Sequence, residues 1–181
     1  MRLIDQCTDR KIHTRNISIA TYNCSENSIV VEGILKDDRQ ISYFVPEQDA
    51  IPPGTVHHMI VRMRIQGPSL TIANVEVEMP ATPHADCIDL KNSLDRLVGL
   101  RIVPGFTSRV KKAIGGVKGC VHLTTLVLAM APAAVQGYWT HRGSRPSDDP
   151  ISTEAVEQYL INTCRVWRRN GPLAQKVLAR T

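Results

Sequence analysis

Two stretches of strict alternation, on either side of Gly67-Pro68, constrain the fold more than any other feature of this sequence. In both stretches apolar side chains recur at every second position, and charged or amide side chains stand between them. A period of two is typical of β-strands that bury one face and expose the other. The inward positions are His57, Met59, Val61, Met63, Ile65, Ala73, Val75, Val77 and Met79. The sequence therefore predicts an antiparallel hairpin over residues 57–79.

The chain before this hairpin also has strand character. Residues 17–22 and 29–35 are rich in β-branched side chains and are separated by a polar, turn-forming segment. Residues 42–45 resemble a short edge strand that stops at Pro46, because proline cannot donate to a ladder. We expect these segments to extend the sheet of the hairpin.

After Pro80 and Pro83 the apolar spacing changes to that of helices. One helix is predicted to end at Gly99, and another to begin at Thr107. A nearly all-apolar helix should be buried on several sides and kinked or ended by Pro132. The predicted helices span residues 90–98, 107–114, 121–136 and 152–170, with a loop over 141–150.

Strands first and helices afterwards indicate an α+β fold, with an antiparallel sheet from the N-terminal half packed against C-terminal helices. The 181 residues suit a single domain. Within it we expect N-terminal strands in residues 1–50, a core in 56–139 that holds the candidate site, and a C-terminal helix in 151–171 packed on the core.

Composition and charge narrow the cellular compartment and the classes of partner expected for this protein. The start Met-Arg-Leu-Ile-Asp-Gln lacks an apolar signal core, which favours a cytoplasmic, bacterial protein. The longest apolar stretch, residues 126–135, is about half a membrane span, so no membrane association is expected. The net charge of +5 comes from short basic runs without interleaved aromatic residues, which argues against nucleic acid as a partner.

Five cysteines without an export signal indicate thiols, metal ligands or nucleophiles rather than disulfides. Three of them lack a neighbouring group of residues comparable to a metal or catalytic site and are interpreted as structural, namely Cys7, Cys24 and Cys164. Cys87 and Cys120 instead stand where a loop meets a helix, near histidines. A thiol at a helix N-terminus is favoured as thiolate by the helix dipole.

The candidate site combines these two cysteines with His57, His58 and His122. Two cysteines and two histidines make a tetrahedral set for zinc or iron. Alternation along a strand sends His57 and His58 to opposite faces, so only one of the pair should serve. Cys120 and His122 can share an ion only if Cys120 precedes the first helical turn.

Two other interpretations of these residues stay open. Cys120 could be a nucleophile with His84 or His58 as base and Asp86 as its partner. Alternatively, the cysteines are buried apolar side chains of an interaction module. A phosphate-binding loop is excluded, because no Lys-Ser/Thr follows Gly115, Gly116 and Gly119.

The run from Gly105 to Leu126, with its G-x-x-G-C-x-H-L core, resembles a bacterial family of domains of unknown function, family 2889. The His13-Thr14-Arg15 step, the His58-Met59 step and the region of Cys87 are similar to that family as well. The resemblance covers most of the chain and implies no particular activity.

A remoter resemblance is to the U-type iron–sulfur assembly scaffolds. The matching stretches are His58-Met59, Ala73 to Cys87, Leu97 to Gly99, and Gly116 to Cys120. The resemblance implies that Cys87 and Cys120 occupy two of the three cysteine positions of the scaffold, with a histidine at the first. Because fewer thiolates are present than in the scaffolds, the sequence supports a mononuclear zinc or iron site as well as it supports an iron–sulfur cluster.

Three hypotheses of function follow. The first is a metal- or cluster-binding accessory protein whose partner is another protein. The second is a small enzyme that acts on a small-molecule substrate through a Cys120 nucleophile or a bound metal. The third is a non-catalytic interaction module, and a homo-oligomer is compatible with all three. A shared metal ion predicts that Cys87 and Cys120 converge, with His57 or His58 nearby.

Overall fold

The computed structural model describes residues 2–7, 11–25, 27–47, 49–144 and 152–179. In chain order its elements are η1 (Leu3–Gln6), β1 (His13–Ser25), β2 (Ser28–Arg39), β3 (Gly54–Gln66), β4 (Thr71–Ala81), η2 (Ala85–Leu97), α1 (Phe106–Ile114), η3 (Gly116–Lys118), α2 (Val121–Arg142), α3 (Thr153–Tyr159) and α4 (Pro172–Leu178). This composition and order confirm the α+β fold class.

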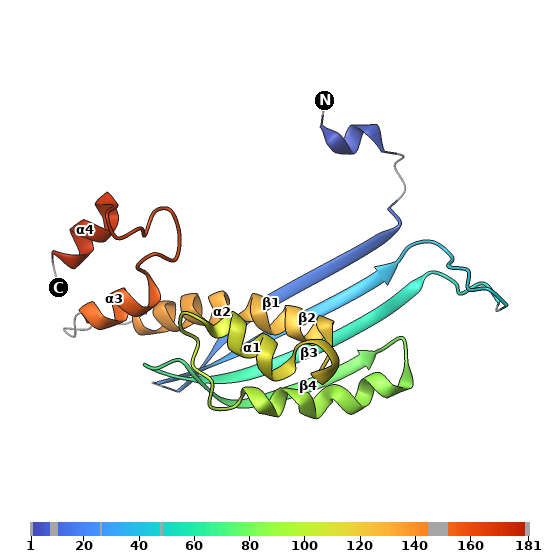
Figure 1. Cartoon of the computed structure of the whole chain (residues 1–181), viewed down its shortest axis with the longest axis horizontal. Helices are drawn as coiled ribbons and strands as arrows, with labels where there is room; N and C mark the ends of the chain where they lie inside the picture. Colours follow the sequence, from blue (N-terminus) through green and yellow to red (C-terminus); the bar gives the residue numbers. More distant parts are fainter. Residues whose placement is uncertain (1, 8–10, 26, 48, 145–151, 180–181) are drawn as a thin grey trace.

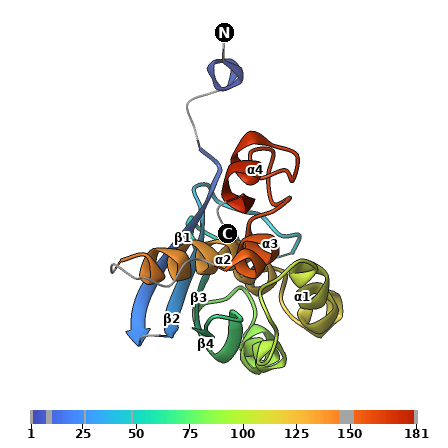
Figure 2. The ribbon, with the colours of Figure 1, turned by 90° about the vertical axis from the view of Figure 1, so that its left-hand side faces the viewer.

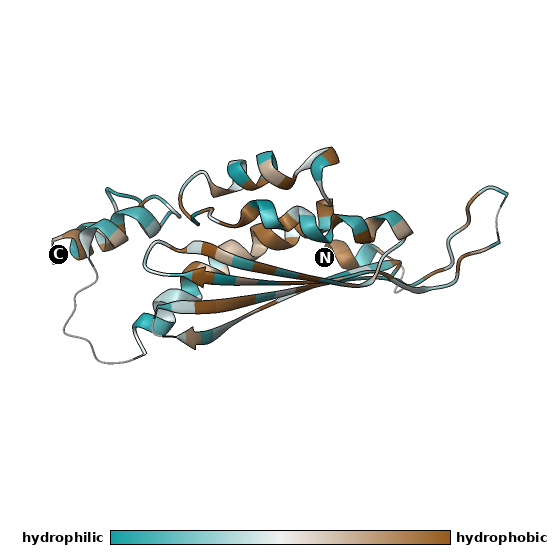
Figure 3. Ribbon diagram, turned by 90° about the horizontal axis from the view of Figure 1, so that it is seen from below, coloured by the Kyte–Doolittle hydropathy of each residue, from teal (hydrophilic) through white to brown (hydrophobic). Residues whose placement is uncertain are grey.

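The strands form one antiparallel sheet in the order β1-β2-β3-β4. The predicted hairpin of residues 57–79 is confirmed as β3 and β4. Ile17, Leu35 and Met59 stand opposite one another across β1, β2 and β3, so their side chains share one face. Through much of β3 and β4 apolar and polar residues alternate, and Figure 3 shows hydrophobic and hydrophilic segments along the strands.

Helices α1 and α2, together with η2, cover one face of this sheet (Figures 1 and 2). Helix α2 lies across β1, β2 and β3 and also packs on α1, whereas η2 packs along β4. Val61 and Met63 of β3 are fully buried under this layer, and Val75 and Val77 of β4 are partly buried against the same core. The predicted contact of the apolar helix with the sheet and with another helix is confirmed, but β4, which carries Val75 and Val77, packs mainly against η2 instead of α2.

Helix α2 is apolar because it is the central helix of the core. Leu123, Leu126, Val127 and Met130 are completely buried. By length and hydropathy alone α2 could cross a membrane, but 44% of its most apolar window is buried inside this protein. Its place on the sheet accounts for its composition as a core helix.

Several predicted boundaries differ from the structure. Residues 42–45 form no strand, and Tyr43 makes only an isolated bridge with Ile51. The helix predicted at 90–98 is the longer 3-10 helix η2, although Gly99 does follow its C-cap with a positive φ of 86°, as expected. Helix α2 continues past Pro132 to Arg142, so the predicted loop begins later, and its residues 145–150 lie outside the described residues.

The C-terminal segment is not the single helix predicted over 152–170. Ser152 does cap a helix, but α3 ends at Tyr159. The chain then turns at Asn162, which has a φ of 61° and whose N–H donates to Trp167 O at 2.8 Å. Asparagine tolerates this conformation. Its hydrogen bond to Trp167 O closes a loop, so the helix does not continue. Trp167 is therefore outside any helix.

This segment forms its own small hydrophobic cluster around Val156, Ile161 and Ala174. Trp167 packs against this cluster and is partly buried. Tyr159 joins the segment to the turn between β3 and β4 and to α2, because its hydroxyl donates to Pro68 O at 3.1 Å and its ring packs edge-on against Trp139. Contact with the body thus runs through Tyr159.

Gly67 should be intolerant of any side chain. A Cβ at this position would overlap the ring of Tyr138, which is itself buried at the far end of α2. We expect Gly67→Ala to lower the free energy of unfolding by about 1–3 kcal/mol through overpacking, measured by urea denaturation. The matched control is Gly54→Ala, whose Cβ would meet nothing within 4 Å. Equal effects of the two substitutions would contradict this account.

Candidate functional site

A row of polar side chains crosses three strands at the end of the sheet that lies under the start of α2. Arg15 of β1 stands opposite Asp37 of β2, and Asp37 stands opposite His57 of β3. Because cross-strand partners point to the same face, all three side chains meet on the side covered by the helices. The buried stripe of β2, which runs Ile29, Val31, Gly33, Leu35, ends at this carboxylate.

Asp37 is the buried centre of the site, with only 2% of its side chain exposed. Arg15 donates to both carboxylate oxygens, from Nε to Oδ1 at 2.7 Å and from Nη2 to Oδ2 at 2.7 Å. This bidentate, charge-assisted pair lowers the pKa of Asp37 and raises that of Arg15. His13 Nε2 lies 3.7 Å from Oδ1. The carboxylate is therefore ionised where it is buried.

Two imidazole rings lie against the other side of the carboxylate. His57 Nδ1 is 3.1 Å from Asp37 Oδ2, and His122 Nε2 is 3.7 Å from the same oxygen. The two rings stack with centroids 3.7 Å apart. Burial lowers the pKa of His122, and the charges of His57 and Arg15 lower it further. His122 is thus a neutral imidazole at neutral pH.

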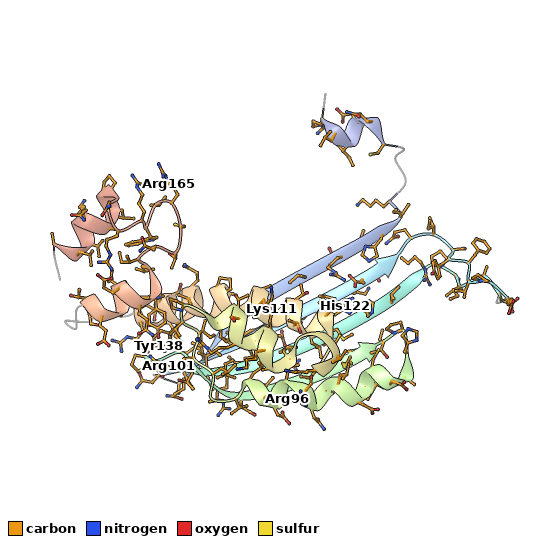
Figure 4. The ribbon with its side chains drawn as sticks, viewed as in Figure 1. Arg96, Arg101, Lys111, His122, Tyr138 and Arg165 are labelled. Atoms are coloured by element: carbon orange, nitrogen blue, oxygen red, sulfur yellow. The ribbon has the colours of Figure 1, made fainter. Side chains whose placement is uncertain are left out.

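His122 reaches this position from the first turn of α2, over the ends of β2 and β3 (Figure 4). The turn before the helix is tight, because a Cβ on Gly119 would overlap the carbonyl oxygen of Ile114. This close approach places Cys120 at the N-cap of α2 with extended backbone. Cys120 Sγ lies 3.6 Å from His122 Nδ1. The condition for both residues to belong to one site, that Cys120 precede the helix, is met.

Asp37, His57 and His122 offer ligand atoms that all lie within 4.8 Å of one another. Among the described residues they are the group of three or more histidine, cysteine or acidic side chains that is close enough to hold a metal ion. The group contains two of the predicted ligands, His57 and His122, and no cysteine. His57 and His122 come from elements far apart in the chain, as a site built by the fold requires.

The remaining predicted ligands lie elsewhere. His58 stands opposite Lys36 and Ala81, on the face of the sheet away from the helices. The prediction that only one residue of the His57-His58 pair faces the site is confirmed. Cys87 lies in the first turn of η2 and packs, partly buried, against the core. The predicted convergence of Cys87 with Cys120 stays a prediction.

Sequence reasoning missed Asp37 and its partner Arg15. The available signal was a carboxylate that continues the inward alternation of β2 after Leu35, at a position where an apolar side chain is expected. Arg15 holds the corresponding inward position on β1. This signal can be recognised only when the pairing register of β1 and β2 is known.

The fold and the site together define a class of protein: an α+β domain in which a buried carboxylate, two stacked histidines and an N-cap cysteine meet at one end of an antiparallel sheet. Residues 13–136, more than half of the chain, match the family described as "Protein of unknown function (DUF2889)", and the chain belongs to this family. No curated protein and no solved structure matches it. The matched segment begins at His13 and includes every residue of the site.

Loss of Arg15 should destabilise the fold, because Asp37 would keep a buried charge without its main partner. We expect Arg15→Gln to lower the free energy of unfolding by about 2 kcal/mol or more at neutral pH, measured by urea denaturation. The control is Lys36→Gln on the neighbouring strand position, where the ion pair with Asp38 at 3.3 Å is solvent-accessible. Its loss should be below about 1 kcal/mol. A Lys36 effect as large as that of Arg15 would refute the interpretation.

Proposed function

We propose that this protein binds one divalent metal ion, zinc or ferrous iron, through Asp37, His57 and His122. The observation that carries the proposal is the convergence of one buried carboxylate and two imidazoles from β2, β3 and α2 within 4.8 Å. Two histidines and one carboxylate on one side of an ion are a recurrent donor set for zinc and for non-haem iron.

The spacing of the donor atoms suits such an ion. Bonds of about 2.0–2.1 Å in tetrahedral geometry set ligand atoms about 3.3 Å apart. The carboxylate oxygen Oδ2 lies 3.1 Å from His57 Nδ1 and 3.7 Å from His122 Nε2. An ion would replace the contact that His57 Nδ1 now makes with Asp37 Oδ2. The stacked rings of His57 and His122 would have to turn for both nitrogens to point at one ion.

Neighbouring groups hold the donor side chains in protonation states and orientations that suit metal binding. His122 has a lowered pKa and so need not lose a proton on binding, and Asp37 is already ionised. Each carboxylate oxygen has two lone-pair directions, so Oδ2 can keep its bond from Arg15 and still coordinate. Arg15 and Cys120 then act as outer partners that orient Asp37 and His122, a common arrangement around bound metals. The positive charge of Arg15 repels a metal cation, which favours a modest metal affinity.

The donor set favours a mononuclear ion over an iron–sulfur cluster. Clusters are held mainly by cysteine thiolates, and the group of ligands gathered here contains none among the described residues. The two histidine side chains are 15% and 18% exposed, which leaves the ion able to exchange with solvent. An exchangeable ion is compatible with an accessory protein that supplies metal and with an enzyme that uses it.

The metal proposal is tested by three single substitutions. Purified protein is stripped with a chelator and titrated anaerobically with zinc or ferrous ion by calorimetry, and Co²⁺ is added as an optical probe of coordination. We expect one ion per chain in the wild type, and at least about tenfold weaker binding in His57→Gln and in His122→Gln. The control is His58→Gln, which changes the adjacent histidine on the opposite face and should retain the ion.

Two results would overturn the assignment. One is wild-type affinity in both His57→Gln and His122→Gln. The other is a loss of binding in His58→Gln that equals the loss in His57→Gln, which would place the metal on the outer face of the sheet. Circular dichroism on each variant separates loss of the site from loss of the fold.

A second candidate function is thiol chemistry at Cys120, and one observation favours it. His122 bridges the thiol and the carboxylate, with Nδ1 at 3.6 Å from Cys120 Sγ and Nε2 at 3.7 Å from Asp37 Oδ2. A base between a thiol and an orienting carboxylate is the arrangement that activates a cysteine nucleophile. The base and acid therefore differ from the predicted His84, His58 and Asp86, because the helix start brings His122 next to the thiol.

Thiol activation predicts selective alkylation. In metal-free protein near neutral pH, we expect iodoacetamide to modify Cys120 at least about tenfold faster in the wild type than in His122→Gln, followed by peptide mass spectrometry. The exposed Cys164 in the same sample is the internal reference, since its rate should be unchanged by the substitution. Equal Cys120 rates in the two proteins would exclude His122 as an activating base.

A further inference from the structure

A pocket of about 330 Å³ opens beside the metal-ligand group, at the end of the sheet from which the connection between β2 and β3 extends (Figure 1). It is formed by the start of β1, the end of β2, the chain that follows β2, and the start of β3. This size lies at the lower end of the range for small-molecule sites. Its lining residues are Ile12, His13, Arg39, Ile41, Ser42, Tyr43, Val56 and His57.

The lining combines apolar walls with basic groups. Ile12, Ile41 and Val56 provide aliphatic surface, and Tyr43 adds an aromatic ring. The polar members include a guanidinium and two imidazoles, and no aspartate or glutamate is among the eight residues. Complementarity therefore favours a ligand with an apolar body and a negatively charged end.

Arg39 is the lining residue whose bonding is incomplete. Its Nη2 donates to Pro52 O at 3.1 Å, and its guanidinium carbon lies 5.4 Å from the centre of the Tyr43 ring. Its Nε is buried and has no hydrogen-bond partner among the described residues. A buried guanidinium donor without an acceptor is costly. A turn of the Arg39 side chain would present it to a carboxylate, the acceptor that matches the guanidinium fork.

The pocket and the metal-ligand group share histidines. His57 contacts Asp37 through Nδ1 and also lines the pocket, and His13 lies 3.7 Å from Asp37 while lining the same wall. A molecule in the pocket is thus adjacent to the ion of the proposed function. Asp37, His57 and His122 supply three protein ligands, which leaves a position open for such a molecule.

We propose that this pocket binds a small monocarboxylic acid with an aliphatic or aromatic body, its carboxylate held by Arg39 and its body held by Ile12, Ile41, Val56 and Tyr43. The inference deepens the proposed function, because it names the class of molecule that reaches the metal. Recognition of the carboxylate depends on Arg39, which lies outside the ligand group, so binding without metal is expected as well.

The test compares charged and neutral probes of one shape. Benzoate and cyclohexanecarboxylate are titrated into wild-type protein, with benzyl alcohol as the neutral counterpart of benzoate, and binding is followed by ligand-observed NMR and calorimetry. The titrations are made once in chelator and once with zinc. We expect each acid to bind at least about tenfold more tightly than the alcohol in both conditions.

Two arginine substitutions locate the site. Arg39→Gln should weaken benzoate binding at least about tenfold and leave zinc binding unchanged. Arg64→Gln removes an exposed arginine from β3 and should change neither. Conversely, His122→Gln should weaken zinc binding while benzoate binding in chelator persists, so the pocket and the metal site can fail separately.

Three results would overturn the inference directly, and a fourth would reassign the recognition. They are absence of binding by both acids, equal affinity of benzoate and benzyl alcohol for the wild type, and full benzoate affinity in a folded Arg39→Gln protein. The comparison of benzoate with the alcohol requires no variant, so it decides the question even if Arg39→Gln fails to fold. Benzoate binding that appears only with zinc would also count against it, because it would assign recognition to the metal instead of Arg39.

Discussion

The ion pair between Arg15 and Asp37 is the interaction on which the site depends. A carboxylate with 2% of its side chain exposed is stable as an anion only with bonded partners, and Arg15 occupies both of its oxygens at 2.7 Å. That bond requires β1 and β2 in their observed register. The register of β2 and β3 likewise faces His57 toward Asp37, and the start of α2 then closes over the group with His122.

The sheet thus changes character along its length. Through most of β2 and β3 the inward face is apolar and packs under α2, as Leu35 and Met59 show. At the next inward positions, Asp37 and His57, the layer turns polar, and beyond them the pocket opens. A polar site at the end of an apolar layer is held rigidly from one side and reached by solvent from the other. Metal or ligand binding needs both conditions.

His122 connects the two kinds of chemistry considered for this site. Its Nε2 faces the carboxylate and its Nδ1 faces the thiol of Cys120. With a metal at Nε2, the thiol becomes an outer partner of a ligand; without one, the same histidine can act as a base toward the thiol. The geometry is compatible with both, and the proposed metal, where bound, would decide which applies. Cys120 is therefore tied to the site whichever role it has.

Local patterns in the sequence determined the α+β class, the β3-β4 hairpin and the apolar α2 helix, and they named His57, Cys120 and His122 among the five candidate site residues. Alternation and helical spacing depend on neighbouring residues, so they are readable without a fold. The end of the last predicted helix could not be read from the sequence, because the Asn162 N–H donates to Trp167 O only in the folded chain. Asp37 and Arg15 are separated by 22 positions and joined only by strand register. Their pairing, and with it the site, was decided by the tertiary structure, because only the folded sheet buries that carboxylate and brings the two charges together.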